Sequence, residues 1–248
     1  MQLWLGSLLA LLSTALLPLL RVSAVLVTAP ILGDFNVPAR AKMLLAVTLA
    51  LLVAPLHAPA PPVLTGAWWT AAFTEIAIGL LIGFTFKFIF EGIQMGAAVA
   101  AQASALSFGE LASPNEVIPS GAIGSLYAIL AILSFLSFNG HLLILKVLVT
   151  SFSGIADPLT LARSVLDFAA YVLIAGVLLA APVIAALLGV HLAMGAVSKA
   201  APALNLFAVG FPAALLIGLI AIGWSLNGLP GMVGSFTERA VAAASGAP

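Results

Sequence analysis

The chain has 248 residues, of which 63% are hydrophobic and only 6% are charged, and its mean hydropathy is +1.27. Soluble domains carry about 25% charged residues, so this composition excludes a water-exposed globular surface and predicts a membrane protein. Eight Lys and Arg residues balance eight Asp and Glu residues, which leaves no basic excess to attract nucleic acid. The absence of cysteine excludes disulfides and thiolate metal sites.

The first segment carries no charge from Met1 to Leu20, and its first cation is Arg21. A secretory signal places positive charge before its apolar stretch. We therefore expect a retained first helix here rather than a cleaved signal.

Charge-free intervals continue along the chain, over residues 43–74, 117–145, 168–198 and 200–237. About 20 apolar residues cross a bilayer as a helix, which satisfies its own backbone polar groups. A porin-like barrel would need strands of alternating polarity, whereas runs such as 171–180 are apolar on every face. The sequence therefore predicts an all-α integral membrane protein with about six hydrophobic helical regions, near 3–29, 41–56, 67–104, 121–149, 165–196 and 205–228.

Prolines and glycines subdivide these regions. A cluster of four prolines ends the second region, because proline lacks the backbone N–H and clashes with the preceding turn: Pro55, Pro59, Pro61 and Pro62. The third region is long enough to contain a break, for which Glu91-Gly92 is the predicted place.

Glu75 is an ionisable residue in an apolar stretch, which is a functional hypothesis by default. Glu75, Gly79 and Gly83 are spaced by four and share one helix face, and glycines at this spacing allow a second backbone to approach closely. Two roles stay open for Glu75. One is helix packing, with a bond to a neighbouring backbone or to Arg21, and the other is gating or proton relay.

Gly92 and Gly96 form a second stripe of small residues with Ala100. The step from Gly83 to Gly92 turns an ideal helix by about 180°. The two stripes are therefore expected to face opposite ways and to contact partners on both sides, as in an assembled complex. Gly92 and Gly96 are further candidates for helix packing or gating.

Residues 104–120 interrupt the helical pattern with Gly109, Pro114 and Pro119. An ordinary connection is shorter, and long loops are often functional or disordered. This loop also contains the apolar residues Leu106, Phe108 and Leu111, which would need protein or a cavity around them. A simple connector and a functional loop both remain open from these residues alone.

Signatures of catalysis are absent from the sequence, including metal-binding histidine pairs, phosphate-binding lysine loops and nucleophile elbows. His57, His141 and His191 are far apart, and none lies one helical turn from a carboxylate or another histidine. We predict no enzyme, no metal and no cofactor.

Two stretches of the sequence match patterns of a known family. One is Asn139-Gly140-His141. The other, more specific, runs from Ala201 to Pro212 and is similar to a Pro-x-x-Asn-x-Phe-x-x-Gly-Phe-Pro pattern. Its matching residues are Pro202, Asn205, Phe207, Gly210, Phe211 and Pro212. Together these stretches resemble the FliR family of type III secretion export-gate subunits. The resemblance is strongest over residues 21–218 and implies a single FliR-like membrane domain over residues 1–248. Lys199 and His191 depart from the residues common in the family.

The resemblance implies a subunit of the core export gate of the bacterial flagellar type III secretion system, which helps to form and close a channel for unfolded flagellar proteins. Its implied partners are FliP-like and FliQ-like gate subunits, FlhB-like and FlhA-like proteins, unfolded secreted polypeptides and membrane lipid. The implied fold has bent hairpins within a larger helical assembly. The implied location is the bacterial inner membrane at the flagellar basal body, protruding toward the periplasm.

In the FliR-like family, a loop helps to close the channel from inside. By position this plug corresponds to ten residues of the loop described above: Leu106, Ser107, Phe108, Gly109, Glu110, Leu111, Ala112, Ser113, Pro114 and Asn115. The main alternative function is a multipass secondary transporter for a small solute, which would also contain broken helices and intramembrane charge. A membrane enzyme and the homologous subunit of a virulence-type system are further alternatives.

Overall fold

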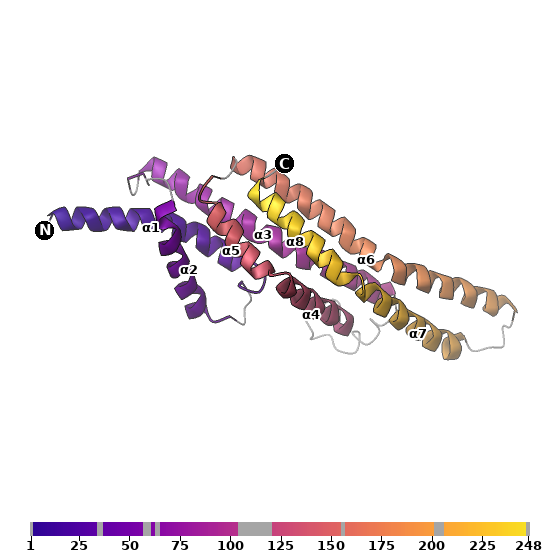
Figure 1. Ribbon diagram of the computed structural model, residues 1–248. Helices are drawn as coiled ribbons and strands as arrows, with labels where there is room; N and C mark the ends of the chain where they lie inside the picture. The colour runs from indigo at the N-terminus through magenta and orange to yellow at the C-terminus, as the bar shows by residue number, and fades with distance from the viewer. Residues whose placement is uncertain are drawn as a thin grey trace. The chain divides into compact units, whose positions relative to one another are not determined.

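The computed structural model describes residues 2–33, 37–56, 61–62, 65–103, 121–154, 157–200 and 206–246 (Figure 1). The all-α prediction is confirmed, because the described residues form α-helices with one short 3-10 helix. These elements are α1 (Gln2–Thr28), α2 (Ala39–Val53), η1 (Ala54–Leu56), α3 (Gly66–Ala103), α4 (Gly121–Ser137), α5 (Gly140–Thr150), α6 (Pro158–Ala200), α7 (Leu206–Leu226) and α8 (Leu229–Ser245).

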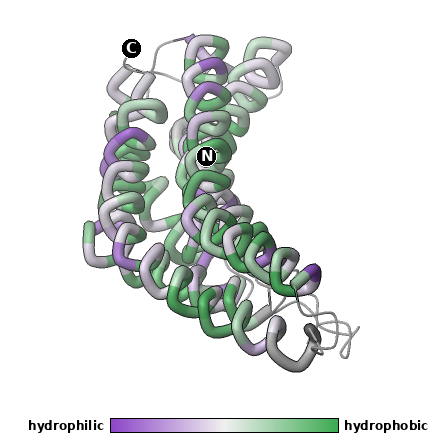
Figure 2. The backbone as a smooth tube through the Cα atoms, turned by 90° about the vertical axis from the view of Figure 1, so that its right-hand side faces the viewer, coloured by the Kyte–Doolittle hydropathy of each residue, from purple (hydrophilic) through white to green (hydrophobic). Residues whose placement is uncertain are grey.

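The helices have the length and composition of membrane spans. Three stretches are long and apolar enough to cross a membrane, namely Ala39–Leu56, Gly66–Ala103 and Pro158–Ala200. Two bent pairs, α4 with α5 and α7 with α8, raise the number to as many as five if each pair is one span. Figure 2 shows how hydrophobic positions outnumber hydrophilic ones along the helices. The class of integral membrane protein predicted from composition is therefore confirmed.

The first of two compact units comprises residues 1–88, 139–169 and 237–248. It contains α1, α2, η1, the first part of α3 and α5. In α2 the buried residues Ala46, Ala50 and Val53 share one face of the helix, which lies against α1. Leu17 of α1 packs with Trp68 and Ala72 of α3. Apolar contacts thus hold both α2 and α3 against α1.

The second unit comprises residues 89–138 and 170–236. Its α3 segment contacts α4 through Phe90 and Phe135, whose rings meet edge to face with centroids 5.3 Å apart. The buried hydroxyl groups of Tyr127 on α4 and Ser225 on α7 are hydrogen-bonded to each other. The C-terminal part of α6 and α7 run side by side as a hairpin (Figure 1).

The break predicted at Glu91-Gly92 is wrong, because α3 is one continuous helix from Gly66 to Ala103. A single glycine costs a helix only about 1 kcal/mol relative to alanine and does not by itself end it. A Cβ atom at Gly92 would lie 2.8 Å from the Val172 carbonyl oxygen of α6. Gly92 therefore allows α3 to lie close to α6 and does not bend α3.

Two other features differ from the six predicted regions. The region predicted as 121–149 is two helices, α4 and α5, bent by 60° at Phe138-Asn139. Helix α8 was not predicted, because its apolar residues alternate with polar ones and do not form a continuous apolar run. Its buried residues nevertheless recur every three or four positions, at Leu229, Val233, Phe236, Ala240 and Ala244. Helical periodicity is the signal that identifies it.

Asn139 makes the bend between α4 and α5 possible. Its φ of 55° and ψ of 30° lie in the left-handed region, which asparagine tolerates better than β-branched residues do. Its side chain makes no capping hydrogen bond to α5, so its backbone conformation is the feature that a substitution tests.

We predict that Asn139→Gly preserves thermal stability in detergent, whereas Asn139→Val lowers it by roughly 1–2 kcal/mol, the cost of a left-handed conformation for a residue with a Cβ atom. The matched control is Asn227→Val, because Asn227 also precedes a glycine at a helix bend but does not have a positive φ. Equal losses for the two valine variants would contradict this explanation.

Candidate functional site

A buried ion pair joins α1 to α3 inside the first unit. The Arg21 Nε donates a hydrogen bond to the Glu75 Oε2 at 2.6 Å, and Nη2 donates to Oε1 at 2.8 Å. The two side chains are only 7% and 9% exposed. The guanidinium and the carboxylate thus meet in the bidentate geometry that gives the strongest such pairs.

The remaining nitrogen of the Arg21 guanidinium, Nη1, bonds to the end of α5. The Arg21 Nη1 donates to the Ser151 carbonyl oxygen at 2.6 Å and to its Oγ at 3.0 Å. The Arg21 Cζ also lies 4.3 Å from the centroid of the Phe152 ring. Because Ser151 is the C-cap of α5, the positive charge lies at the negative end of that helix. One side chain therefore ties together α1, α3 and α5.

The glycines one and two turns after Glu75 bring α1 close enough for this contact. A Cβ atom at Gly79 would lie 2.5 Å from the Arg21 carbonyl oxygen. A Cβ atom at Gly83 would overlap the Thr28 hydroxyl oxygen further along α1. The two helix backbones therefore meet directly, and the ion pair is at one end of this close contact.

Sequence reasoning left a neighbouring backbone and Arg21 open as partners of Glu75, and the structure shows Arg21. It did not assign a role to Ser151 or Phe152. No local signal identifies them, since Ser151 is 130 positions from Arg21 along the chain.

The second glycine stripe has a different neighbour, α6, in the second unit. A Cβ atom at Gly96 would lie 2.9 Å from the Gly176 carbonyl carbon, and one at Gly176 would lie 2.6 Å from the Gly92 carbonyl carbon. The two stripes contact different helices, α1 and α6. Both helices belong to the same chain, so these stripes give no evidence of a partner subunit, contrary to our expectation.

The residues of the predicted signature are only partly described. Asn139-Gly140 forms the bend between α4 and α5, and the buried Nδ1 of His141 has no hydrogen-bond partner within the described residues. Gly210 lies against Met194 of α6, since a Cβ atom there would be 2.9 Å from the Met194 Cε. Pro212 lies within α7.

Other predicted positions fall outside what the structure describes. Pro202, Asn205 and the predicted plug, residues 106–115, lie outside the described residues, and the side chains of Phe207 and Phe211 are not described. Over the described ranges, no three His, Asp or Glu residues form a group suited to a metal ion.

The fold and the site together define an all-α membrane protein in which the ion pair between Arg21 and Glu75 is buried among the chain's own helices. A family described as bacterial export proteins, family 1, matches residues 12–240. The chain belongs to this family. A flagellar biosynthetic protein FliR from Escherichia coli (strain K12) is 34% identical over 208 residues, which cover 82% of this chain and 80% of the relative.

Two further relatives carry the same name. The protein from Pectobacterium carotovorum subsp. carotovorum is 32% identical over 86% of this chain and 84% of its own length. The protein from Bacillus subtilis (strain 168) is 28% identical over 84% of this chain and 83% of its own length. The chain is therefore a membrane-embedded subunit of the flagellar export apparatus. The names of the family and of these relatives refer to no catalytic activity.

We predict that Glu75→Leu or Arg21→Leu destabilises the chain by roughly 3–5 kcal/mol, because each leaves one buried charge without its partner. The double variant Arg21→Leu/Glu75→Leu should lose less than either single variant, since it leaves neither charge. Thermal unfolding in detergent measures the three losses. Additive losses would contradict direct coupling of the two side chains.

Gly96→Ala should destabilise by roughly 1–3 kcal/mol, the usual cost of overpacking a close contact. The matched control is Gly189→Ala on α6, where a Cβ atom would meet nothing within 4 Å. The control should be neutral or slightly stabilising, because alanine favours a helix over glycine. The same thermal assay distinguishes them, and equal effects at both positions would argue against the α3–α6 contact.

Proposed function

We propose that the chain is a subunit of the core export gate, where it helps to form and close the channel through which unfolded flagellar proteins pass. The observation that carries this proposal is the family match over residues 12–240. It acts without catalysis, in the inner membrane at the flagellar basal body, protruding toward the periplasm. Its direct partners are FliP-like and FliQ-like subunits, with FlhB-like and FlhA-like proteins nearby.

Exposed apolar surface supports a role within an assembly. Only 17% of the residues in the Ala39–Leu56 span and 33% of those in the most apolar 18-residue stretch of α6 are buried within the chain. A subunit of a larger complex needs such surface for lipid and for neighbouring subunits. A secondary transporter would instead need a complete solute site in one chain. The most buried charged group described, Arg21, is already bonded to Glu75 and Ser151.

We assign residues 106–115 as the plug of this gate, and the helices on either side suit that role. The helix before the loop, α3, is continuous and is held against α6 through Gly92 and Gly96. The helix after it, α4, is tied to α7 by the hydrogen bond between Tyr127 and Ser225. Both helices belong to the second unit at these points. The two helices that flank the proposed plug are therefore each held to another helix of the second unit.

We assign a packing role to Glu75 within the gate. Bonding to both Arg21 Nε and Nη2 occupies each carboxylate oxygen, as expected of a residue that holds α1 to α3. A proton relay would need a carboxylate that exchanges partners. Assembled gates carrying the Arg21→Leu/Glu75→Leu pair should therefore still export protein.

Deleting Leu106–Asn115 should leave the complex assembled but make the membrane permeable to ions and small solutes. A small, partly apolar loop fills a pore that admits an extended polypeptide, and its loss leaves the pore open. Ion flux into vesicles containing the purified complex measures the effect.

The matched control replaces the same ten residues with a glycine-serine segment of equal length. It keeps the connection and removes the apolar side chains, so it should leak as well. Copurification with the FliP-like and FliQ-like subunits shows that each variant assembles. Unchanged permeability in a fully assembled deletion variant would overturn the plug assignment.

A further inference from the structure

The close contact between α3 and α6 places two segments of the second unit side by side, residues 89–103 and residues 170–181. A Cβ atom at Gly96 would lie 2.9 Å from the Gly176 carbonyl carbon. A Cβ atom at Gly92 would lie 2.8 Å from the Val172 carbonyl oxygen. These contacts fix which residues of the two helices lie at the same level. The two segments together are here called the α3–α6 wall.

The side of α3 that faces away from α6 is polar. Two residues turn a helix by about 200°, so Gln94 lies nearly opposite Gly96. Glu91, Gln94 and Gln102 are all exposed, and their spacing places them within about 80° of one another around the helix. Between residues 89 and 103, the one large hydrophobic side chain that is exposed is Met95. This face therefore presents a carboxylate and two amides.

The side of α6 that faces away from α3 is apolar at the same level. Ile174 and Leu178 lie two positions before and after Gly176, so each is turned by about 200° from the contact with α3. Their side chains are 64% and 63% exposed. The α3–α6 wall thus has a polar side on α3 and an apolar side on α6.

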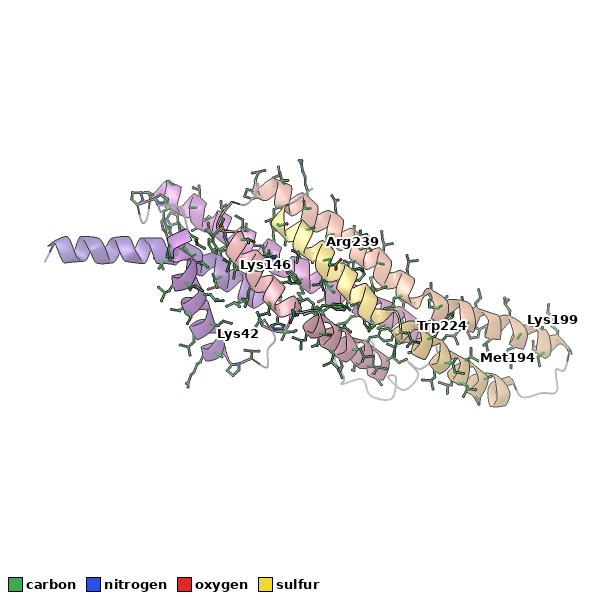
Figure 3. All side chains as sticks on the ribbon, viewed as in Figure 1. Lys42, Lys146, Met194, Lys199, Trp224 and Arg239 are labelled. Atoms are coloured by element: carbon green, nitrogen blue, oxygen red, sulfur yellow. The ribbon has the colours of Figure 1, made fainter. Side chains whose placement is uncertain are left out.

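Charge is rare in the second unit, and Glu91 lies far from either end of its helix. Among the described residues of this unit, the Asp, Glu, Lys and Arg residues are Glu91 and Lys199. Lys199 lies in the last turn of α6, at the end of that helix (Figure 3). Glu91 lies about 18 Å before the end of α3 at 1.5 Å per residue, so its side chain does not reach past the helix end. A carboxylate in such a place needs water or a polar partner beside it.

The difference between the two sides excludes one uniform environment around the wall. Bulk water on both sides would leave Ile174 and Leu178 in contact with it, although large exposed apolar surfaces are normally covered. Hydrocarbon on both sides would surround the carboxylate of Glu91 and the amide of Gln94, and burying such groups without hydrogen bonds is costly. A subunit interface suits the polar side poorly, because charged residues are depleted at the core of protein interfaces. Water on the α3 side, with apolar surroundings on the α6 side, satisfies all of these groups.

We propose that the polar side of the α3–α6 wall, with Glu91, Gln94 and Gln102, lines the water-filled conduit of the gate and contacts the unfolded polypeptide that passes through it. This inference rests on the proposed function and adds which face of the chain is turned toward the exported protein. Amide side chains donate and accept hydrogen bonds, so they suit the backbone of any passing sequence. Met95 is flexible and adapts to differing apolar side chains.

Single cysteines can test each side of the wall, because the natural sequence has none. Gln94→Cys and Gln102→Cys report on the polar side, Ile174→Cys and Leu178→Cys are the matched controls on the apolar side, and Ile93→Cys is the buried control. Each variant is purified in the complete export complex, and copurification with the FliP-like subunit shows that it assembles. One measurement is the rate at which a charged, water-soluble thiol reagent modifies this chain. The other is disulfide crosslinking to an exported flagellar protein that carries cysteines and is arrested in the complex by fusion to a stably folded domain.

We expect the two polar-side cysteines to react about tenfold faster than the apolar-side cysteines, because the reactive thiolate is favoured in water and disfavoured in apolar surroundings. They should also crosslink to the arrested protein, and the apolar-side cysteines should not. Equal rates on the two sides, or unreactive polar-side cysteines, would overturn the proposal. Fast reaction without crosslinking would overturn it too, because the polar side would then face water outside the conduit. These failures leave the proposed function standing as long as the arrested protein remains in the purified complex. A complex that never retains the arrested protein would contradict the proposed function, and this inference with it.

Discussion

The guanidinium of Arg21 lies where a charge without partners would cost several kcal/mol, and this requirement determines how the first unit is built. Its donors reach both oxygens of Glu75 and the Ser151 carbonyl, which come from different helices. The positions of α1, α3 and the end of α5 are therefore coupled, since moving any one of them leaves a buried polar group unbonded. Apolar packing alone would allow these helices to slide.

Glycines make this arrangement possible because the charged side chains reach each other only where the backbones come close. Gly79 removes the Cβ atom that would overlap the Arg21 carbonyl, one turn from the residue that Arg21 binds. Gly92 and Gly96 have the same function toward α6 in the second unit. A single continuous helix, α3, thus contacts α1 within the first unit and α6 within the second.

The sequence predicts those features that depend on residues close to one another along the chain. Charge-free intervals identify the apolar helices, and the four-residue spacing from Glu75 to Gly83 places them on one face. The bend at Asn139 was missed because the Asn139-Gly140 pair, a sequence signal for a turn, lies inside an apolar charge-free interval that was interpreted as one region. Ser151 was missed because the carbonyl that Arg21 binds belongs to the backbone, so no side-chain pattern records it. Helix α8 was missed because its buried apolar residues recur at helical spacing without forming a continuous apolar run.

The lengths of the helices argue that protein, as well as lipid, surrounds this chain. The 43 residues of α6 extend about 65 Å at 1.5 Å per residue, roughly twice the hydrocarbon thickness of a bilayer. A helix of this length that crosses a bilayer near its normal extends well beyond the hydrocarbon core. Ile174 and Leu178 of α6 are 64% and 63% exposed. Apolar side chains exposed along the whole of so long a helix need a covering beyond the chain's own helices and beyond lipid, and the neighbouring subunits of the proposed gate would supply it.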